Sequence, residues 1–321
     1  MKTVAVITGW LLAAAAAFAQ GYPNRAVKVV VPWPPGQATD IAARVVAERL
    51  QVAFGQPFVI DNRPGAGGAI GSDAVVKSPA DGYTLLAASS GPLSIMPNLQ
   101  KIPYDPLKDL APASLVARVP FALVTHPSFP AANAREFIAA IKADPAKYTF
   151  SSSGTGATAH LFTELFNSMA QIQGTRHVPY KGTAPAITDI INGQITYTVE
   201  TVAATAAHVK SGRLKTYGVS TKQRAGAMPE APPLAEAAGL PDYDAAAWIG
   251  YMAPAGTPRE ALARISSEIQ KALQSAELKE RFLSLGLDPV SSTPDEMAAF
   301  MRREQERYGI IIRDANIKVE Q

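Results

Sequence analysis

The sequence predicts an α/β fold in which sheets and helices form two domains. Strand-like runs of β-branched residues alternate with stretches of helical period, which is typical of sheets joined by crossover helices. A strand, a glycine turn and a helix follow one another twice, with the turns at Pro35-Gly36 and at Gly154-Thr155-Gly156. The length of 321 residues exceeds that of an average single domain, which favours two domains.

The first half of the chain contains one set of alternating elements. Its pattern predicts strands over residues 26–31, 58–60 and 84–88, a helix over 39–54 and a glycine-rich helix over 66–76. A second set follows the apolar run 121–124. Its expected strands are 148–152, 176–178, 195–199 and 214–219, and its expected helices are 134–141, 158–169, 185–191 and 202–209.

The last part of the chain is predicted to be helical. Pro258 stands at the start of one helix, where its missing N–H has no cost. A second helix over 277–285 is followed by Gly286, the residue type that commonly ends helices. Thr293 is expected to cap a third helix, whose first residue is Pro294.

The composition excludes several classes of function. The net charge is +3, charged residues make up 18%, and no block of Lys and Arg marks a nucleic-acid partner. The chain has no cysteine, which excludes disulfides, thiolate metal sites and thiol catalysis. None of the 4 histidines has the spacing of a metal-ligand pair, so we expect neither a metal nor a cofactor.

Residues 1–20 are predicted to be a secretory signal peptide. Lys2 precedes an apolar run, and Ala17-Phe18-Ala19 fits the A-x-A cleavage rule. The apolar run has about 15 residues and is shorter than the roughly 20 that span a bilayer, which disfavours a membrane anchor. The mature protein is therefore expected to be exported.

Two stretches match catalytic or cofactor motifs only in part. Ser151-Ser152-Ser153-Gly154-Thr155-Gly156 is not a G-x-S-x-G nucleophile turn, and no spacing nominates a histidine and an acid for a hydrolase that uses Ser153. Gly65-Ala66-Gly67-Gly68-Ala69-Ile70-Gly71 carries Ile70 where a dinucleotide motif needs its third glycine. The favoured interpretation of this second stretch is a tight turn that packs a helix closely on the sheet.

Binding of a ligand without catalysis is the better interpretation of the two glycine turns. A strand that ends in such a turn before a helix directs the free N–H groups and the positive dipole end of the helix at one spot. This arrangement attracts an anion without Lys or Arg. One turn lies in each predicted domain, which suggests two anion-binding ends that face a cleft.

A series of motifs in this sequence resembles the Bug family, the periplasmic solute-binding receptors of tripartite tricarboxylate transporters. The resemblance covers essentially the whole chain after the expected signal peptide, in order. The motifs are Val31-Pro32-Trp33-Pro34-Pro35-Gly36 with Thr39-Asp40 and Ala43-Arg44, Asp61-Asn62-Arg63-Pro64-Gly65-Ala66-Gly67-Gly68 with Ile70-Gly71, Asp81-Gly82-Tyr83-Thr84-Leu85-Leu86, Ser153-Gly154-Thr155-Gly156 with His160, Val178-Pro179-Tyr180-Lys181-Gly182, Ile191-Asn192-Gly193-Gln194, Gly250 with Ala253-Pro254-Ala255-Gly256-Thr257-Pro258, and Ala315-Asn316-Ile317-Lys318.

The resemblance implies a two-domain periplasmic-binding-protein (Venus flytrap) fold. Each domain would be a mostly parallel sheet flanked by helices, with the ligand in the interdomain cleft. Residues 22–124 and 246–321 would form domain 1, and residues 125–245 would form domain 2. The hinge strands are expected near 121–126 and 245–253.

The resemblance also implies which residues hold the ligand. The loop after the first strand would bind one carboxylate, and the glycine loop of domain 2 would meet the other end of the ligand. Gln37 departs from the family pattern, which has a second glycine at that position. The implied ligand-binding residues are Trp33, Gly36, Gln37, Ala38, Thr39 and Asp40, then Ser90, Gly91 and Pro92, then Ser153, Gly154, Thr155, Gly156 and His160, and finally Lys181, Glu200 and Thr201.

Five of these side chains also have an interpretation without the ligand. Asp40 would repel an anion, so we expect it to accept from an N–H group or to hold a water. His160 either contacts the ligand or bonds the backbone, and Trp33 is either a wall for an aromatic ligand or a lid on its own domain. Lys181 has the alternative of a solvated lysine. Glu200 is unfavourable beside a carboxylate unless the ligand also carries an amine.

The expected function is therefore capture of a small organic carboxylate in the periplasm and delivery to the membrane subunits of a tripartite tricarboxylate transporter. Dicarboxylates, tricarboxylates and aromatic acids all fit, and the sequence does not choose between them. The protein is expected to be a monomer and not an enzyme, with no cofactor and no nucleic-acid partner. The alternatives are an exported hydrolase that uses Ser153 and a ligand sensor without a dedicated transporter.

Overall fold

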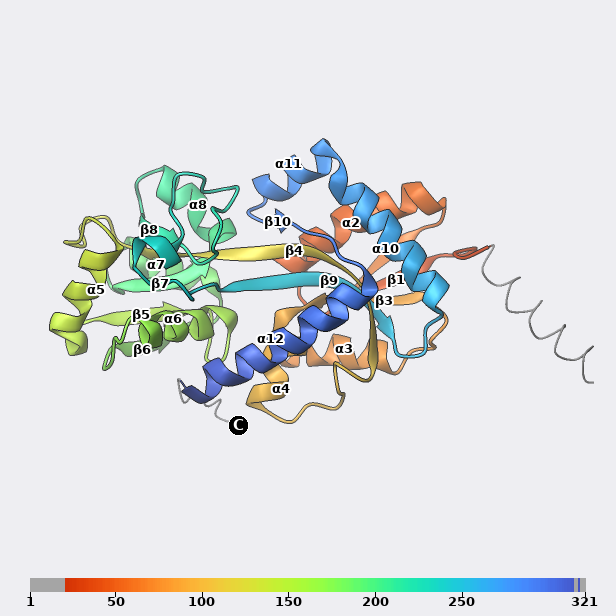
Figure 1. Cartoon of the computed structure of the whole chain (residues 1–321), viewed down its shortest axis with the longest axis horizontal. Coiled ribbons are helices and arrows are strands. Elements are labelled where there is room, and N and C mark those ends of the chain that lie inside the picture. The colour runs from red at the N-terminus through yellow and green to blue at the C-terminus, as the bar shows by residue number, and fades with distance from the viewer. Residues whose placement is uncertain (1–20, 315–316, 318–321) are drawn as a thin grey trace, which may run out of the picture.

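The computed structural model describes residues 21–314 and 317, and the expected signal peptide at 1–20 lies outside these residues. Two sheets flanked by helices form two domains, which are joined by the strands β4 (Leu110–Thr125) and β9 (Ala246–Pro254) (Figure 1). The two-domain α/β fold class expected from the sequence is confirmed. No helix among the described residues is both long and apolar enough to cross a membrane.

Domain 1 is built around the strand order β2-β1-β3-β9-β4, with β10 on the other side of β4. Helices α2 and α10 cover one face of this sheet, and α3 and α12 cover the other (Figure 1). Besides β9 and the first part of β4, its elements are β1 (Val27–Val31), α2 (Ala38–Phe54), β2 (Phe58–Asn62), η1 (Ala66–Gly68), α3 (Ala69–Val76), β3 (Thr84–Ser89), η2 (Gly91–Ile95), α4 (Met96–Leu99), α10 (Arg259–Gln274), α11 (Ala276–Ser284), β10 (Asp288–Pro289) and α12 (Pro294–Asp314).

Domain 2 is built around the last part of β4, which pairs with β7 and β8. The strand β5 joins β7 to β6 through parallel pairing. Helices α5 and α6 contribute to the core on one face, and α7 and α8 to the core on the other. The remaining elements are α5 (Ala134–Ala143), η3 (Pro145–Lys147), β5 (Thr149–Ser152), α6 (Thr158–Met169), β6 (Arg176–Pro179), α7 (Thr183–Ile191), β7 (Tyr197–Thr201), α8 (Val202–Lys210), β8 (Lys215–Val219) and α9 (Leu234–Ala237).

The strand β4 is much longer than the apolar run 121–124 that the sequence analysis recognised. It pairs with β9 as far as Pro120, and with β7 and β8 from Phe121 onward. Prolines normally interrupt a strand because they lack the N–H group that a ladder uses. In β4, Pro112 lies at a register shift and Pro120 lies where the pairing changes partners, so both prolines are accommodated.

The glycine-rich segment 66–76 does not form the single helix that was expected. A short 3₁₀ turn over Ala66–Gly68, with Gly67 at φ +60°, precedes α3. A Cβ added at Gly71 would lie 2.7 Å from the Arg63 carbonyl oxygen and 2.8 Å from the Pro32 Cα. The segment therefore packs a helix closely against the end of β1, as the tight-turn interpretation predicts.

The C-terminal helices begin and end close to where the sequence predicts. Pro258 lies one residue before α10, and Gly286 follows α11 with φ +71°. At the start of α12, the Glu296 N–H donates to Thr293 Oγ1 (3.2 Å) and the Thr293 N–H donates to the Glu296 carboxylate (2.8 Å). This reciprocal pair is a capping box, so the expected role of Thr293 is confirmed.

Strand directions decide which loops lie between the domains. The strand β3 is antiparallel to β9, which is antiparallel to β4, so β1, β2 and β3 run in the same direction as β4. Since β4 passes from domain 1 into domain 2, the carboxyl ends of these strands point toward domain 2. The strand β7 is antiparallel to β4, and β5 and β6 are parallel to β7, so their carboxyl ends point back toward domain 1.

Candidate functional site

The nominated residues lie at or after the carboxyl ends of strands that point toward the other domain. Loops at such strand ends are the usual place of a ligand in α/β proteins. Domain 1 contributes the turn after β1, with Trp33, Gly36, Gln37, Ala38, Thr39 and Asp40, and the segment after β3, with Ser90, Gly91 and Pro92. Domain 2 contributes the turn after β5, with Ser153, Gly154, Thr155, Gly156 and His160, then Lys181 after β6 and Glu200 and Thr201 at the end of β7.

Asp40 shapes the turn after β1. One of its carboxylate oxygens accepts from the Gly36 N–H (2.8 Å), and the other accepts from Asn62 Nδ2 (2.8 Å). Arg44, four residues further along α2, donates from Nε to the same carboxylate at 3.0 Å. Asn62 also donates to the Trp33 carbonyl oxygen (3.0 Å), which joins the end of β2 to the turn.

The Asp40 side chain is fully engaged in hydrogen bonds within this turn and to its neighbours Asn62 and Arg44. The residue is only 2% exposed. Burial alone raises the pKa of its carboxyl, but hydrogen bonds from Arg44, Gly36 and Asn62 outweigh burial and hold the pKa below its ordinary value. Asp40 is therefore ionised at neutral pH, and both of its oxygens already accept from the protein.

Trp33 lies across the neighbouring segment of domain 1. Its indole N–H donates to Ser89 Oγ (2.9 Å) at the end of β3. A Cβ added at Gly91 would lie 3.1 Å from the Trp33 ring, so the ring packs closely on the Gly91 backbone. Trp33 thus covers its own domain and keeps a partly exposed face.

The turn after β5 uses the same local arrangement as the turn after β1. The Gly156 N–H donates to Nδ1 of His160 (3.1 Å), four residues later, as the Gly36 N–H donates to Asp40. His160 is 6% exposed. Its bond goes to a backbone N–H group, and it requires Nδ1 to be unprotonated.

His160 is stacked on a second histidine, His177 of β6. The ring centroids lie 3.9 Å apart and the ring planes differ by 8°. Burial together with the charge of His177 lowers the pKa of His160 to about 3, and burial lowers the pKa of His177 to about 4. Both imidazoles are therefore neutral at physiological pH.

Ser152, the last residue of β5, joins this histidine pair to the glycine turn. Its hydroxyl lies 2.7 Å from Nε2 of His177, donates to the Gly154 carbonyl oxygen (3.0 Å) and accepts from the Gly154 N–H (3.2 Å). Ser153, the nucleophile of the hydrolase alternative, has no hydroxyl bond to a histidine among the described residues. Its carbonyl oxygen accepts from the Gly182 N–H at 3.2 Å.

Glu200 is buried at the point where two helices begin. Its carboxylate accepts from the Thr201 N–H (2.7 Å) before α8 and from Thr183 Oγ1 (3.2 Å) at the start of α7. Burial raises the pKa of Glu200, against these hydrogen bonds, which lower it. The side chain is 2% exposed, so it positions the ends of α7 and α8 instead of facing solvent.

Other nominated residues present exposed groups. Gln37 and Thr155 are exposed in the two turns, and Lys181 is exposed after β6. No side chain among the described residues caps the N-terminus of α2 or of α6, so the first N–H groups of both helices are free to meet an anion.

The sequence analysis missed a layer of supporting residues. Asn62 and Arg44 both stand in motifs that resemble the family, but neither was expected to support the turn, and the helical spacing of Arg44 from Asp40 is a usable signal. Ser152 and His177 carry no such signal, because they come from two strands that meet only through sheet pairing. Among the described residues, no group of three or more His, Asp or Glu side chains is arranged to hold a metal ion.

Comparisons with known proteins agree with this arrangement. Residues 42–317 match the family model of the tripartite tricarboxylate transporter family receptor. Protein BugT of Bordetella pertussis is 40% identical over 311 residues, which cover 95% of this chain and 94% of BugT.

Solved structures extend the likeness to proteins with bound ligands. R. palustris Rpa4515, solved with adipate, has a TM-score of 0.81 and 33% identity, and the match covers 92% of this chain and 99% of that chain. MatC from Rhodopseudomonas palustris, solved with bound malate, has a TM-score of 0.76 and 28% identity, with 91% of this chain and 100% of MatC covered.

Proposed function

This chain belongs to the family of tripartite tricarboxylate transporter receptors, and we propose that it binds a small organic carboxylate between its two domains. Receptors of this family are periplasmic solute-binding proteins and not enzymes. We propose further that this protein works as a monomer after removal of residues 1–20 and delivers its ligand to the membrane subunits of a tripartite transporter.

The observation that carries the proposal is the pair of glycine turns at facing strand ends. Each turn leads into a helix whose N-terminus is uncapped by a side chain, namely α2 in domain 1 and α6 in domain 2. The free N–H groups and the helix dipole favour a negative charge at each place. Two carboxylates on one ligand would satisfy both turns at once, which favours a dicarboxylate.

The similar proteins support this class of ligand. Adipate and malate, named with two of the similar structures, are both dicarboxylates, and they differ in length and in hydroxylation. Tricarboxylates and aromatic acids also offer two anionic or polar ends. A ring would contact the partly exposed face of Trp33, so the response to aromatic acids reports on that residue.

Domain closure would couple binding to transport. Only a closed arrangement offers both turns to one ligand, so a bridging ligand shifts the population toward that arrangement. The domain limits of 22–124 with 246–321 and of 125–245 stay predictions. They lie close to the change of pairing partner between Pro120 and Phe121 in β4.

Thermal unfolding against a panel of carboxylates tests the proposal. The panel is adipate, malate, citrate, glutamate and phthalate. A ligand at a hundredfold excess over its dissociation constant stabilises the native state by about 2.7 kcal/mol, which raises the melting temperature. No rise with any member of the panel would contradict the proposed class of ligand.

The variant Gln37→Asp tests whether a ligand that raises the melting temperature binds at the turn after β1. Gln37 is the exposed N-cap of α2, and aspartate is a better N-cap, so the ligand-free protein should be at least as stable as the natural one. The new charge repels a carboxylate, so the ligand-induced rise should be lost. A rise equal to that of the natural protein would show that the ligand binds elsewhere.

The matched control is Asn133→Asp at the N-cap of α5. Asn133→Asp also introduces one negative charge at the N-cap of a helix. It follows the carboxyl end of β4, which points away from domain 1 (Figure 1). The control should therefore keep the full ligand-induced rise.

A further inference from the structure

The helix α12 reaches from domain 1 to domain 2 (Figure 1). Its first turns belong to domain 1, where Met297 and Met301 are buried and Phe300 packs edge-on against Trp248 with ring centroids 6.0 Å apart. Its later turns contact α6 of domain 2. The ring of Tyr308 stacks on Phe162, with centroids 6.1 Å apart and planes that differ by 13°.

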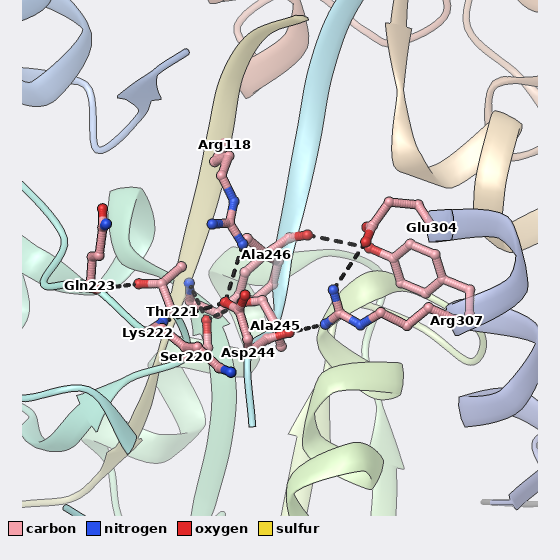
Figure 2. A network of polar contacts seen from close by, with 12 residues as sticks. Arg118, Ser220, Thr221, Lys222, Gln223, Asp244, Ala245, Ala246, Glu304 and Arg307 are labelled. Atoms are coloured by element: carbon pink, nitrogen blue, oxygen red, sulfur yellow. Dashed lines mark hydrogen bonds and ion pairs between the residues drawn. The ribbon is translucent and has the colours of Figure 1, made fainter. Parts of the chain in front are cut away.

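The same later turns are bonded to the chain where it enters β9. Arg307 donates from Nη2 to the Asp244 carbonyl oxygen (Figure 2). The Tyr308 hydroxyl donates to the Ala246 carbonyl oxygen at 3.4 Å. Arg118 of β4 donates to the Asp244 carboxylate at 3.1 Å. This part of α12 is thus attached to both strands that connect the domains.

The opposite side of these turns is fixed to domain 1. Asn98 of α4 donates to the Gln305 carbonyl oxygen (2.9 Å), and a Cβ added at Gly309 would lie 2.7 Å from Asn98 Oδ1. Burial raises the pKa of the Tyr308 hydroxyl, and the nearby side chain of Ser90, directly after β3, counters part of this rise. Tyr308 therefore lies between a nominated ligand loop of domain 1 and the helix that carries His160.

A surface pocket of about 440 Å³ lies beside this contact between α6 and α12. It is lined by Leu165 of α6, by Asp242, and by Arg303, Glu306, Arg307, Ile310 and Ile311 of α12. The contact of Tyr308 with Phe162 is itself buried. This contact lies next to a connecting strand, because the Tyr308 hydroxyl also donates to the carbonyl oxygen of Ala246, the first residue of β9.

We propose that α12 is a third connection between the domains, and that the stacking of Tyr308 on Phe162 sets the angle at which domain 2 is held. Tyr308 is a positioning residue, since its ring contacts Phe162 of α6, the helix that carries His160. The proposal concerns the ligand-free protein. Only its consequence for affinity rests on the proposed function.

An interdomain distance measured in the ligand-free protein tests the proposal. The chain has no natural cysteine, so Gln51→Cys on α2 and Lys142→Cys on α5, both exposed, give a specifically spin-labelled pair. Double electron–electron resonance then reports the distribution of the distance between the domains. Tyr308→Leu removes the stacked ring and should broaden this distribution about twofold.

A conservative variant and a second substitution separate positioning from general destabilisation. Tyr308→Phe keeps the ring and should keep the natural distribution. Phe162→Leu removes the other half of the stack and should broaden the distribution as Tyr308→Leu does. The double variant should add nothing further, because both substitutions break one contact.

The control is Phe300→Leu, which removes an aromatic contact of the same helix within domain 1. It should lower the melting temperature and leave the interdomain distribution unchanged. A natural distribution in folded Tyr308→Leu, or a broadened one in Phe300→Leu, would overturn the proposal. If adipate or malate binds the natural protein, Tyr308→Leu should also weaken that binding about fivefold or more.

Discussion

Replacing Asp40 by asparagine should destabilise the protein through the turn after β1. The natural carboxylate accepts from the Gly36 N–H and from Asn62 Nδ2, each at 2.8 Å, and from Arg44. Asparagine has the same size but one acceptor oxygen, so its own amide N–H₂ must face a group that also donates. One buried donor is then left without an acceptor.

The expected loss is about 2 to 4 kcal/mol in the free energy of unfolding. A buried donor without a partner costs roughly 1 to 3 kcal/mol, and a bond to a charged acceptor contributes roughly 1.5 to 3 kcal/mol. The Arg44 side chain is 51% exposed, so its share is below about 1 kcal/mol. The first two amounts cannot simply be added, because the loss of a bond to the carboxylate is what leaves the donor unpaired.

Urea unfolding followed by circular dichroism measures this loss. The matched control is Asp61→Asn. Among the described residues the Asp61 side chain pairs with the exposed Arg63 alone, at 2.8 Å, so this variant should lose less than about 1 kcal/mol. Equal stability of Asp40→Asn and Asp61→Asn would refute the reasoning. It would mean that the turn after β1 does not depend on the Asp40 carboxylate.

Two further predictions concern the histidine pair and one glycine. Because the folded-state pKa values of His160 (about 3) and His177 (about 4) lie below the usual 6.5, the unfolded chain binds more protons, and stability falls as the pH drops below 6.5. Between pH 6 and 4.5, His177→Gln should reduce the fall in the free energy of unfolding by about 1 kcal/mol per pH unit, as measured by denaturant unfolding at several pH values. A pH dependence equal to that of the natural protein would contradict the lowered pKa of His177. Buried carboxyl groups with raised pKa values act in the opposite direction, but equally in both proteins. Gly71→Ala should destabilise by about 1 to 3 kcal/mol because its Cβ would overlap Pro32, and an unchanged urea midpoint would show that α3 shifts at little cost.

The sequence was sufficient to predict what depends on neighbouring residues. Hydrophobic period located α2 and α6 within a residue or two, and the glycine turns before them stand where they were expected. The capping box at Thr293 is equally local. Each of these features is decided within one turn of the chain, so a pattern in a short window is enough to find it.

The remaining features depend on contacts between distant segments. The sequence did not predict the length of β4, because Pro112 and Pro120 are residues that usually interrupt a strand. Both are tolerated, since Pro112 lies at a register shift and Pro120 lies where the pairing partner changes. The contact of His160 with His177 needs β5 and β6 to pair in one register. The helix α12 crosses the connecting strands because it packs against both domains. No local pattern in the sequence of the helix predicts this packing.

The two glycine turns, after β1 and after β5, are each held by a buried residue. In one turn the acceptor of the glycine N–H is the buried Asp40, and in the other it is the buried His160. The exposed positions beside them, such as Gln37 and Thr155, take no part in holding the turn. A substitution at an exposed position of either turn therefore leaves the acceptor of the glycine N–H in place, so such a position can vary without loss of the bond that shapes the turn.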